Sequence, residues 1–413
     1  MSRSSGLRAI GPGLLVAATG VGAGDLATGA FTGNKVGTTV LWVVVLGAAF
    51  KWVLSEGLVR YQLDTGETIL EGALGRGGRL ARGLFLGYLF VWSFFVGAAL
   101  MSACGVAFHA LVPVLSPERG KVVFGIAHSA AAYGLVRLGG YRAFERVMKG
   151  LIVAMFALVV WTAIALRPPL DEIAAGLVVP RIPDAGGQGL AWTIALMGGV
   201  GGTLTIVCYA YWIREERREG VEALGGCRLD LAVGYGVTAL FAAAMVVIGS
   251  RVPPVEGGGA TLIVRLGDLL REEVGGAARW AFLLGAWAAV FSSLLGVWQS
   301  VPYVFADAAA VGAGRRGARV DVGGRAYRSF LVAIATVPAL GLVWTFVTMQ
   351  KLYAIVGALF VPLLAVALLI LNGRSGPVSA TSRNRAAAIG LLWAVLLFFV
   401  AAGALELRRK FLG

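Results

Sequence analysis

The chain alternates long apolar runs with short polar segments. A helix that crosses the hydrocarbon core of a bilayer needs about 20 mostly apolar residues, and the sequence offers eleven runs of this kind. They are 9–33, 38–60, 83–112, 120–137, 147–166, 189–213, 229–250, 279–306, 328–348, 351–371 and 387–406. A further stretch, 261–273, is amphipathic and predicts a helix at the membrane surface. The pattern therefore predicts an all-α polytopic membrane protein with eleven transmembrane helices.

Glycine clusters interrupt the first and the sixth span, at 20–25 and 198–203. Each glycine costs about 1 kcal/mol relative to alanine in a helix interior, so both spans are expected to unwind there. Unwound backbone in a membrane must be buried in protein or line a wet cavity. Interrupted helices at matching places in two halves indicate the binding site of a secondary transporter. The alternative is that these glycines only allow close helix packing.

The matching places of the two clusters imply an internal repeat. One repeat covers 9–166 and the other 189–371, while the last span, 387–406, lies outside both. Five spans per repeat is an odd number, so the second repeat is expected to be inverted. We expect one transmembrane domain over 1–413, with a cytoplasmic N-terminus because Lys and Arg are enriched in the segments on that side.

Composition excludes several classes of protein. Hydrophobic residues make up 58% and charged residues 14%, and the mean hydropathy is +0.82, which excludes a soluble enzyme. The net charge of +14 lies in short loops, where it sets topology, so we expect no nucleic-acid partner. The three cysteines and two histidines form no metal-ligand or disulfide pattern, and we expect no cofactor. The spans contain no known catalytic motif, so we expect no enzyme.

Few ionisable residues lie inside the spans, and each is a functional candidate because burying a charge is costly. Asp25 follows the first glycine cluster, where it is a candidate cation ligand or, alternatively, the N-cap of the second half-helix. Lys51 and Glu56 are candidates for a proton pathway. Alternatively, Glu56 pairs with Arg60 four residues later, and Lys51 neutralises a carboxylate or extends to the membrane surface.

Hydroxyl and amide groups add candidate ligands. Thr203 and Thr205 flank the second cluster, where they either bind a substrate or bond back to helix carbonyls. Gln299 and Tyr303 share a helix face with Ser292, which predicts either the lining of a substrate path or interhelical hydrogen bonds.

Several short motifs occur in an order that resembles the Nramp family of proton-coupled divalent-metal transporters. They are Gly11-Pro12-Gly13, Thr65-Gly66, the run 140–145, Tyr327-Arg328, Val337-Pro338-Ala339 and Pro362-Leu363-Leu364. The resemblance implies a LeuT-type fold, with five plus five inverted-repeat helices and an eleventh outside the repeat. It also adds Arg328 to the candidates for a proton pathway.

The candidate site departs from the family pattern. Family members carry Asp-Pro-Gly-Asn at the first break, whereas this chain has Gly22 in place of the ligand Asp and Asp25 in place of the ligand Asn. At the second break the ligand Met becomes Gly202, and only the carbonyls of Thr19 and Gly199 carry over unchanged. A site of one carboxylate, carbonyls and hydroxyls suits Mg²⁺ or Ca²⁺ better than a softer transition metal.

We therefore expect a multi-pass transporter of an inner or plasma membrane that moves a divalent cation by alternating access, with proton coupling implied by the resemblance. Two alternatives stay open. One is a transporter of the same fold for a small organic solute with an anionic group. The other is a membrane protein that kept the fold and does not transport.

Overall fold

The computed structural model describes residues 11–184, 188–251 and 259–412, and these contain helices and no strands. The helices are α2 (Pro12–Gly20), η1 (Val21–Asp25), α3 (Leu26–Val36), η2 (Gly37–Val40), α4 (Leu41–Thr65), α5 (Ile69–Leu111), α6 (Pro117–Ala165), α7 (Leu170–Val178), α8 (Gln188–Gly199), η3 (Leu204–Cys208), α9 (Tyr209–Glu215), η4 (Val221–Ala223), α10 (Leu224–Ser250), α11 (Gly259–Glu273), α12 (Gly276–Gly312), α13 (Arg325–Thr336), η5 (Val337–Val343), α14 (Phe346–Ala358), α15 (Phe360–Leu371), η6 (Ala380–Ser382) and α16 (Ala386–Leu412).

Each of the eleven expected spans coincides for most of its length with helical segments, and residues 9 and 10 of the first span lie outside the described residues. Within the described residues, eight continuous helical stretches are long and apolar enough to cross a membrane. This number is lower than eleven partly because neighbouring spans join. The stretch Leu26–Thr65 runs from the first span into the second, and α6 holds the fourth and fifth on either side of Gly140, whose φ is 66°.

The expected boundary between the ninth and tenth spans is wrong. The ninth helix ends at Val343, Trp344 is extended, and α14 begins at Phe346. The physical reason is an N-cap, because the side chain of Thr345 accepts a hydrogen bond from the backbone N–H of Thr348. The amphipathic helix at 261–273 is confirmed as part of α11, which buries Ile263, Leu266 and Leu270.

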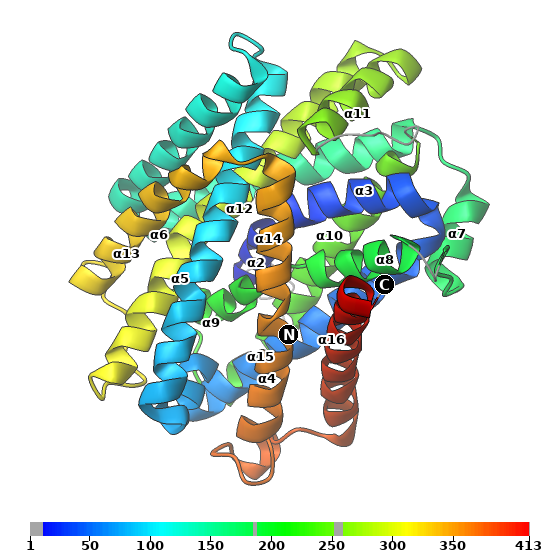
Figure 1. The fold of residues 1–413 in the computed structure, drawn as a ribbon. Coiled ribbons are helices and arrows are strands. Elements are labelled where there is room, and N and C mark those ends of the chain that lie inside the picture. Colours follow the sequence, from blue (N-terminus) through cyan, green and yellow to red (C-terminus); the bar gives the residue numbers. More distant parts are fainter. Residues whose placement is uncertain (1–10, 185–187, 252–258, 413) are drawn as a thin grey trace, which may run out of the picture.

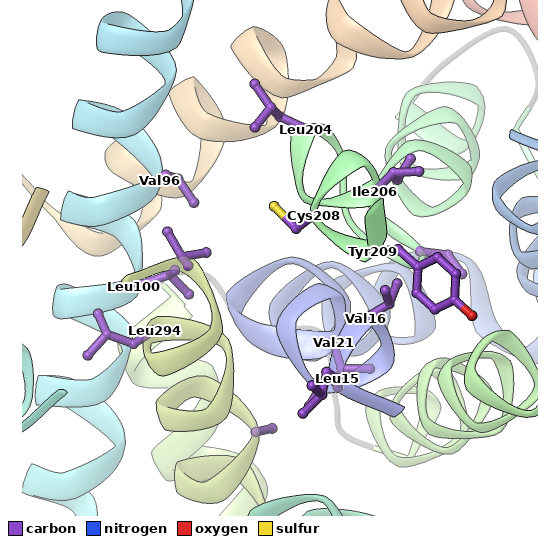
Figure 2. Close-up of a cluster of buried hydrophobic side chains, with 14 of the residues drawn as sticks. Leu15, Val16, Val21, Val96, Leu100, Leu204, Ile206, Cys208, Tyr209 and Leu294 are labelled. Carbon is purple, nitrogen blue, oxygen red and sulfur yellow. The ribbon is translucent and has the colours of Figure 1, made fainter. Parts of the chain in front are cut away.

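The first span and η3 lie in the interior of the bundle, while α16 stands at its edge beside α15 and α4 (Figure 1). Figure 2 shows apolar side chains from α2, η1, η3, α9, α5 and α12 gathered around the interrupted helices. The labelled residues are Leu15, Val16, Val21, Val96, Leu100, Leu204, Ile206, Cys208, Tyr209 and Leu294. This apolar packing places the two interrupted helices against one another.

Helices α2 and α10 approach closely because both carry glycine at the crossing. A Cβ added at Gly234 would lie 2.3 Å from the carbonyl oxygen of Gly13. A Cβ at Gly13 would lie 2.1 Å from the carbonyl oxygen of Asp230. Such contacts leave no room for a side chain, so part of the glycine content serves helix packing.

Asp230 of α10 holds the beginning of α2. Its carboxylate accepts hydrogen bonds from the backbone N–H groups of Gly11 and Gly13, both at 2.9 Å, and from the hydroxyl of Tyr209 at 2.8 Å. Arg218 adds a salt bridge at 3.3 Å. The first N–H groups of a helix have no partner within the helix, and Asp230 supplies one from a distant part of the chain.

Gly234→Ala tests the close approach of α2 and α10. We expect it to lower the thermal stability of the purified protein, because overpacking costs about 1–3 kcal/mol. Gly236 lies on the same helix, and a Cβ there would meet nothing within 4 Å, so Gly236→Ala is the matched control. We expect the control to leave the melting temperature unchanged or to raise it, and equal shifts in the two variants would contradict the assigned packing.

Asp230→Ala tests the anchoring of α2. Breaking a buried, charged hydrogen-bond network costs about 3 kcal/mol or more, which corresponds to roughly a hundredfold faster local exchange. Hydrogen–deuterium exchange of the amides in residues 13–20 measures this local exchange rate. Asp268→Ala, which removes a partly exposed ion pair between α11 and α12, is the control. Unchanged exchange in the Asp230 variant would show that α2 is anchored by other contacts.

Candidate substrate site at two helix breaks

The first span is interrupted between α2 and α3. The backbone of Gly22 is not helical, with φ −42° and ψ −136°. A Cβ at Gly22 would lie 2.2 Å from both Cβ and Oγ of Ser293 on α12, so this position requires glycine. The predicted interruption of the first span is therefore present.

The sixth span is interrupted between α8 and η3. Gly201 and Gly202 have φ values of 78° and 81°, in the left-handed region that favours glycine. Helix α8 ends at Gly199 and η3 begins at Leu204. Both glycine clusters thus break their helices, as the sequence predicts.

The two breaks contact each other. A Cβ at Gly20 would lie 2.8 Å from the carbonyl carbon of Gly201. The Asp25 side chain, only 1% exposed, accepts a hydrogen bond through Oδ2 from the backbone N–H of Gly201 at 3.3 Å. Asp25 makes no capping hydrogen bond to α3, so the alternative of an N-cap does not hold. Its second oxygen, Oδ1, has no hydrogen-bond partner among the described residues.

Lys51 reaches the second break from α4. Its side chain is 0% exposed, and its ammonium group donates hydrogen bonds to the carbonyl oxygens of Gly198, at 3.3 Å, and Gly202. Asp25 contacts the same break through the N–H of Gly201, and no salt bridge joins it to Lys51 among the described residues. The structure places the ammonium group of Lys51 at the break that Asp25 also contacts, whereas Glu56 is paired with Arg60 and Arg228.

Helix α12 contributes a serine that the sequence analysis did not single out. Ser293 donates a hydrogen bond to the carbonyl oxygen of Thr19 at 2.6 Å. The neighbouring Ser292 donates instead to Ala289 of its own helix at 2.9 Å, with a longer contact to Ala18 at 3.3 Å. The hydroxyl of Thr19 is buried and has no partner among the described residues.

The remaining hydroxyl and amide candidates mostly hold helices together. Thr203 accepts a hydrogen bond from the indole N–H of Trp92 at 3.2 Å, and Thr205 is buried beside Gly202. Gln299 accepts from the indole N–H of Trp212 at 2.7 Å, and the hydroxyl of Tyr303 donates to Glu215 at 2.7 Å. For Gln299 and Tyr303 the structure therefore agrees with interhelical hydrogen bonding.

The candidates for a proton pathway do not form a continuous chain. Glu56 pairs with Arg60 at 3.2 Å and with Arg228 at 2.6 Å. Arg328 is exposed on α13, and of the three candidates only Lys51 lies at the breaks.

The site is made of oxygen atoms. The described residues contain no group of three or more His, Cys, Asp or Glu that could hold a metal ion. Around the two breaks lie the Asp25 carboxylate and the carbonyl oxygens of Thr19, Gly198 and Gly202. Such hard ligands suit a hard cation. The carbonyl oxygen of Gly199 accepts a hydrogen bond from the backbone N–H of Gly202 at 3.4 Å, within the second break.

Comparisons with known proteins agree with this architecture. A family model described as natural resistance-associated macrophage protein-like (Nramp) matches residues 13–407. An uncharacterized protein of Pasteurella multocida is 25% identical over 70% of this chain and 67% of its own length. The divalent metal cation transporter MntH of Yersinia enterocolitica is 23% identical over 71% of each chain.

Solved structures share the fold. A mutant of the Eremococcus coleocola manganese transporter superposes with a TM-score of 0.75 at 16% identity, covering 96% of this chain and 85% of that one. MhsT in complex with L-phenylalanine gives a TM-score of 0.62 at 16% identity, covering 95% and 97%. The all-α, LeuT-type fold and the multi-pass membrane architecture are thereby confirmed. The chain belongs to the Nramp family.

Proposed function

We propose that the chain is a secondary transporter that carries a divalent cation by alternating access around the two helix breaks. One observation carries the proposal: the breaks meet in the interior, where Asp25 is buried and its Oδ1 has no partner among the described residues. A buried carboxylate oxygen without a partner is costly, and a cation would offset this cost. A relative named as a divalent metal cation transporter and a similar structure named as a manganese transporter support the proposal, since neither is named as an enzyme.

A group of polar contacts between helices supports the alternating-access part of the proposal. At the side of the bundle that holds Gly11, Arg214 of α9 forms a salt bridge with Glu71 of α5 at 2.8 Å. Asp307 of α12 accepts hydrogen bonds from Tyr211 at 2.7 Å and Thr68 at 2.8 Å. These contacts join the second half of the sixth span to α5 and α12. An opening of the site toward this side would have to break them.

The hard ligands favour Mg²⁺ or Ca²⁺ as cargo over a transition metal that prefers sulfur. We place the N-terminus in the cytoplasm and the protein in an inner or plasma membrane, on the distribution of Lys and Arg. Protons are the candidate coupling ion, and a pH gradient in the uptake experiment tests this.

One observation favours a second candidate. The ammonium of Lys51 donates to carbonyl oxygens at the same break that Asp25 contacts, so the site holds a basic as well as an acidic side chain. Such a site also suits a small organic solute with an anionic group, which the positive ends of half-helices bind.

Uptake into proteoliposomes, together with calorimetric binding of Mg²⁺, Ca²⁺ and Mn²⁺, tests the proposal. We expect Asp25→Asn to weaken divalent-cation binding at least about tenfold, or about 1.4 kcal/mol, because it removes the charge at the breaks. Asp64→Asn is the control, since Asp64 binds Ser379 at the end of α4, away from the breaks. Absence of divalent-cation binding to the unmodified protein at millimolar concentrations would refute the cation proposal and favour a solute screen.

A further inference from the structure

We propose that the ammonium of Lys51 is a tethered cation that takes the place of the cargo when the transporter is empty. Cargo and Lys51 then use the same oxygen atoms in turn. This inference rests on the proposed transport of a divalent cation and adds how the site selects and releases it.

The hydrogen bonds of Lys51 carry the inference. Its ammonium group contacts the carbonyl oxygens of Gly198 and Gly202, on the two sides of the break in the sixth span. These carbonyls have lost helical partners, so they are acceptors open to a cation. A cargo ion that binds the same oxygens cannot coexist with the ammonium group, because both would need the same space.

Charge balance supports the exchange. Lys51 and Asp25 are buried side chains of opposite charge type that contact the same break, Lys51 at Gly198 and Gly202 and Asp25 at Gly201. With both side chains ionised the empty site buries no net charge, and without Lys51 it would hold an uncompensated carboxylate. A divalent ion added to the intact pair would instead bury an excess of positive charge.

The surroundings leave Lys51 free for this role. Glu56, on the same helix, is already paired with Arg60 and Arg228. From α10, the ring of Tyr235 packs against Gly201, and its hydroxyl is hydrogen-bonded with Ser55 at 2.7 Å.

This Ser55–Tyr235 pair, one helical turn beyond Lys51, provides oxygen acceptors for a displaced ammonium group. In the part of the chain that the structure describes, no Lys or Arg side chain forms a salt bridge with Asp25, whose hydrogen bond is to Gly201.

Calorimetric titration of the full-length protein in nanodiscs with Mn²⁺, Mg²⁺ and Ca²⁺ tests the exchange. We expect Lys51→Met to bind at least one of these ions tenfold more tightly, because the internal competitor is gone. Lys51→Gln keeps two N–H donors for the carbonyls without the charge. It replaces Lys51→Met in the titration if that variant does not fold. Lys121→Met is the control, since Lys121 is also buried and donates to a carbonyl, that of Trp344, far from the breaks.

Proteoliposome flux provides the second measurement. The Lys51 variants should retain exchange of internal for external Mn²⁺ but lose most net uptake, because their empty state leaves Asp25 unpaired.

Equal or weaker binding in both Lys51 variants, with clear binding to the unmodified protein, would overturn the inference and leave the proposed transport standing. Net uptake as fast as exchange in these variants would overturn it as well. Absence of Mn²⁺, Mg²⁺ and Ca²⁺ binding in every variant would refute the proposed transport and the inference together.

Discussion

The structure depends on how the backbone groups freed at two helix breaks are satisfied in the interior of a membrane protein. Lipid offers no hydrogen bonds, so protein groups must supply them. Ser293 donates to the carbonyl of Thr19, Asp25 accepts from the N–H of Gly201, and Lys51 donates to the carbonyls of Gly198 and Gly202. These side chains come from different spans, so the breaks tie together the first, second, sixth and eighth.

Glycine makes this arrangement possible in two ways. At 201 and 202 it allows a left-handed backbone, and at 20 and 22 it allows backbone and side chains to approach within distances that a Cβ would forbid. Elsewhere, as at Gly13 and Gly234, it allows helices to cross closely. Helix breaking and helix packing are therefore both present, at different glycines, and the two interpretations of the glycine content do not exclude each other.

The sequence was sufficient for features that depend on local pattern. Apolar runs predicted the spans, and glycine clusters predicted the two breaks with Asp25 beside one of them. It was not sufficient for contacts that depend on which helices meet. Ser293 rather than Ser292 faces the first break, Lys51 reaches carbonyls 147 and 151 residues away, and Asp230 anchors a helix start 217 residues away. No periodicity within one helix specifies such partners. Gln299 and Tyr303 were placed on the correct helix, but their partners come from elsewhere in the fold.

An experimental structure of the full-length protein in buffer free of divalent cations, at a resolution that places side chains, is the most direct test. Our account predicts non-helical backbone at Gly22 and at 201–202, with the ammonium group of Lys51 within hydrogen-bond distance of the carbonyl oxygens of Gly198 and Gly202. Continuous helices through both glycine clusters, or a Lys51 side chain directed to Glu56 instead of the breaks, would contradict it.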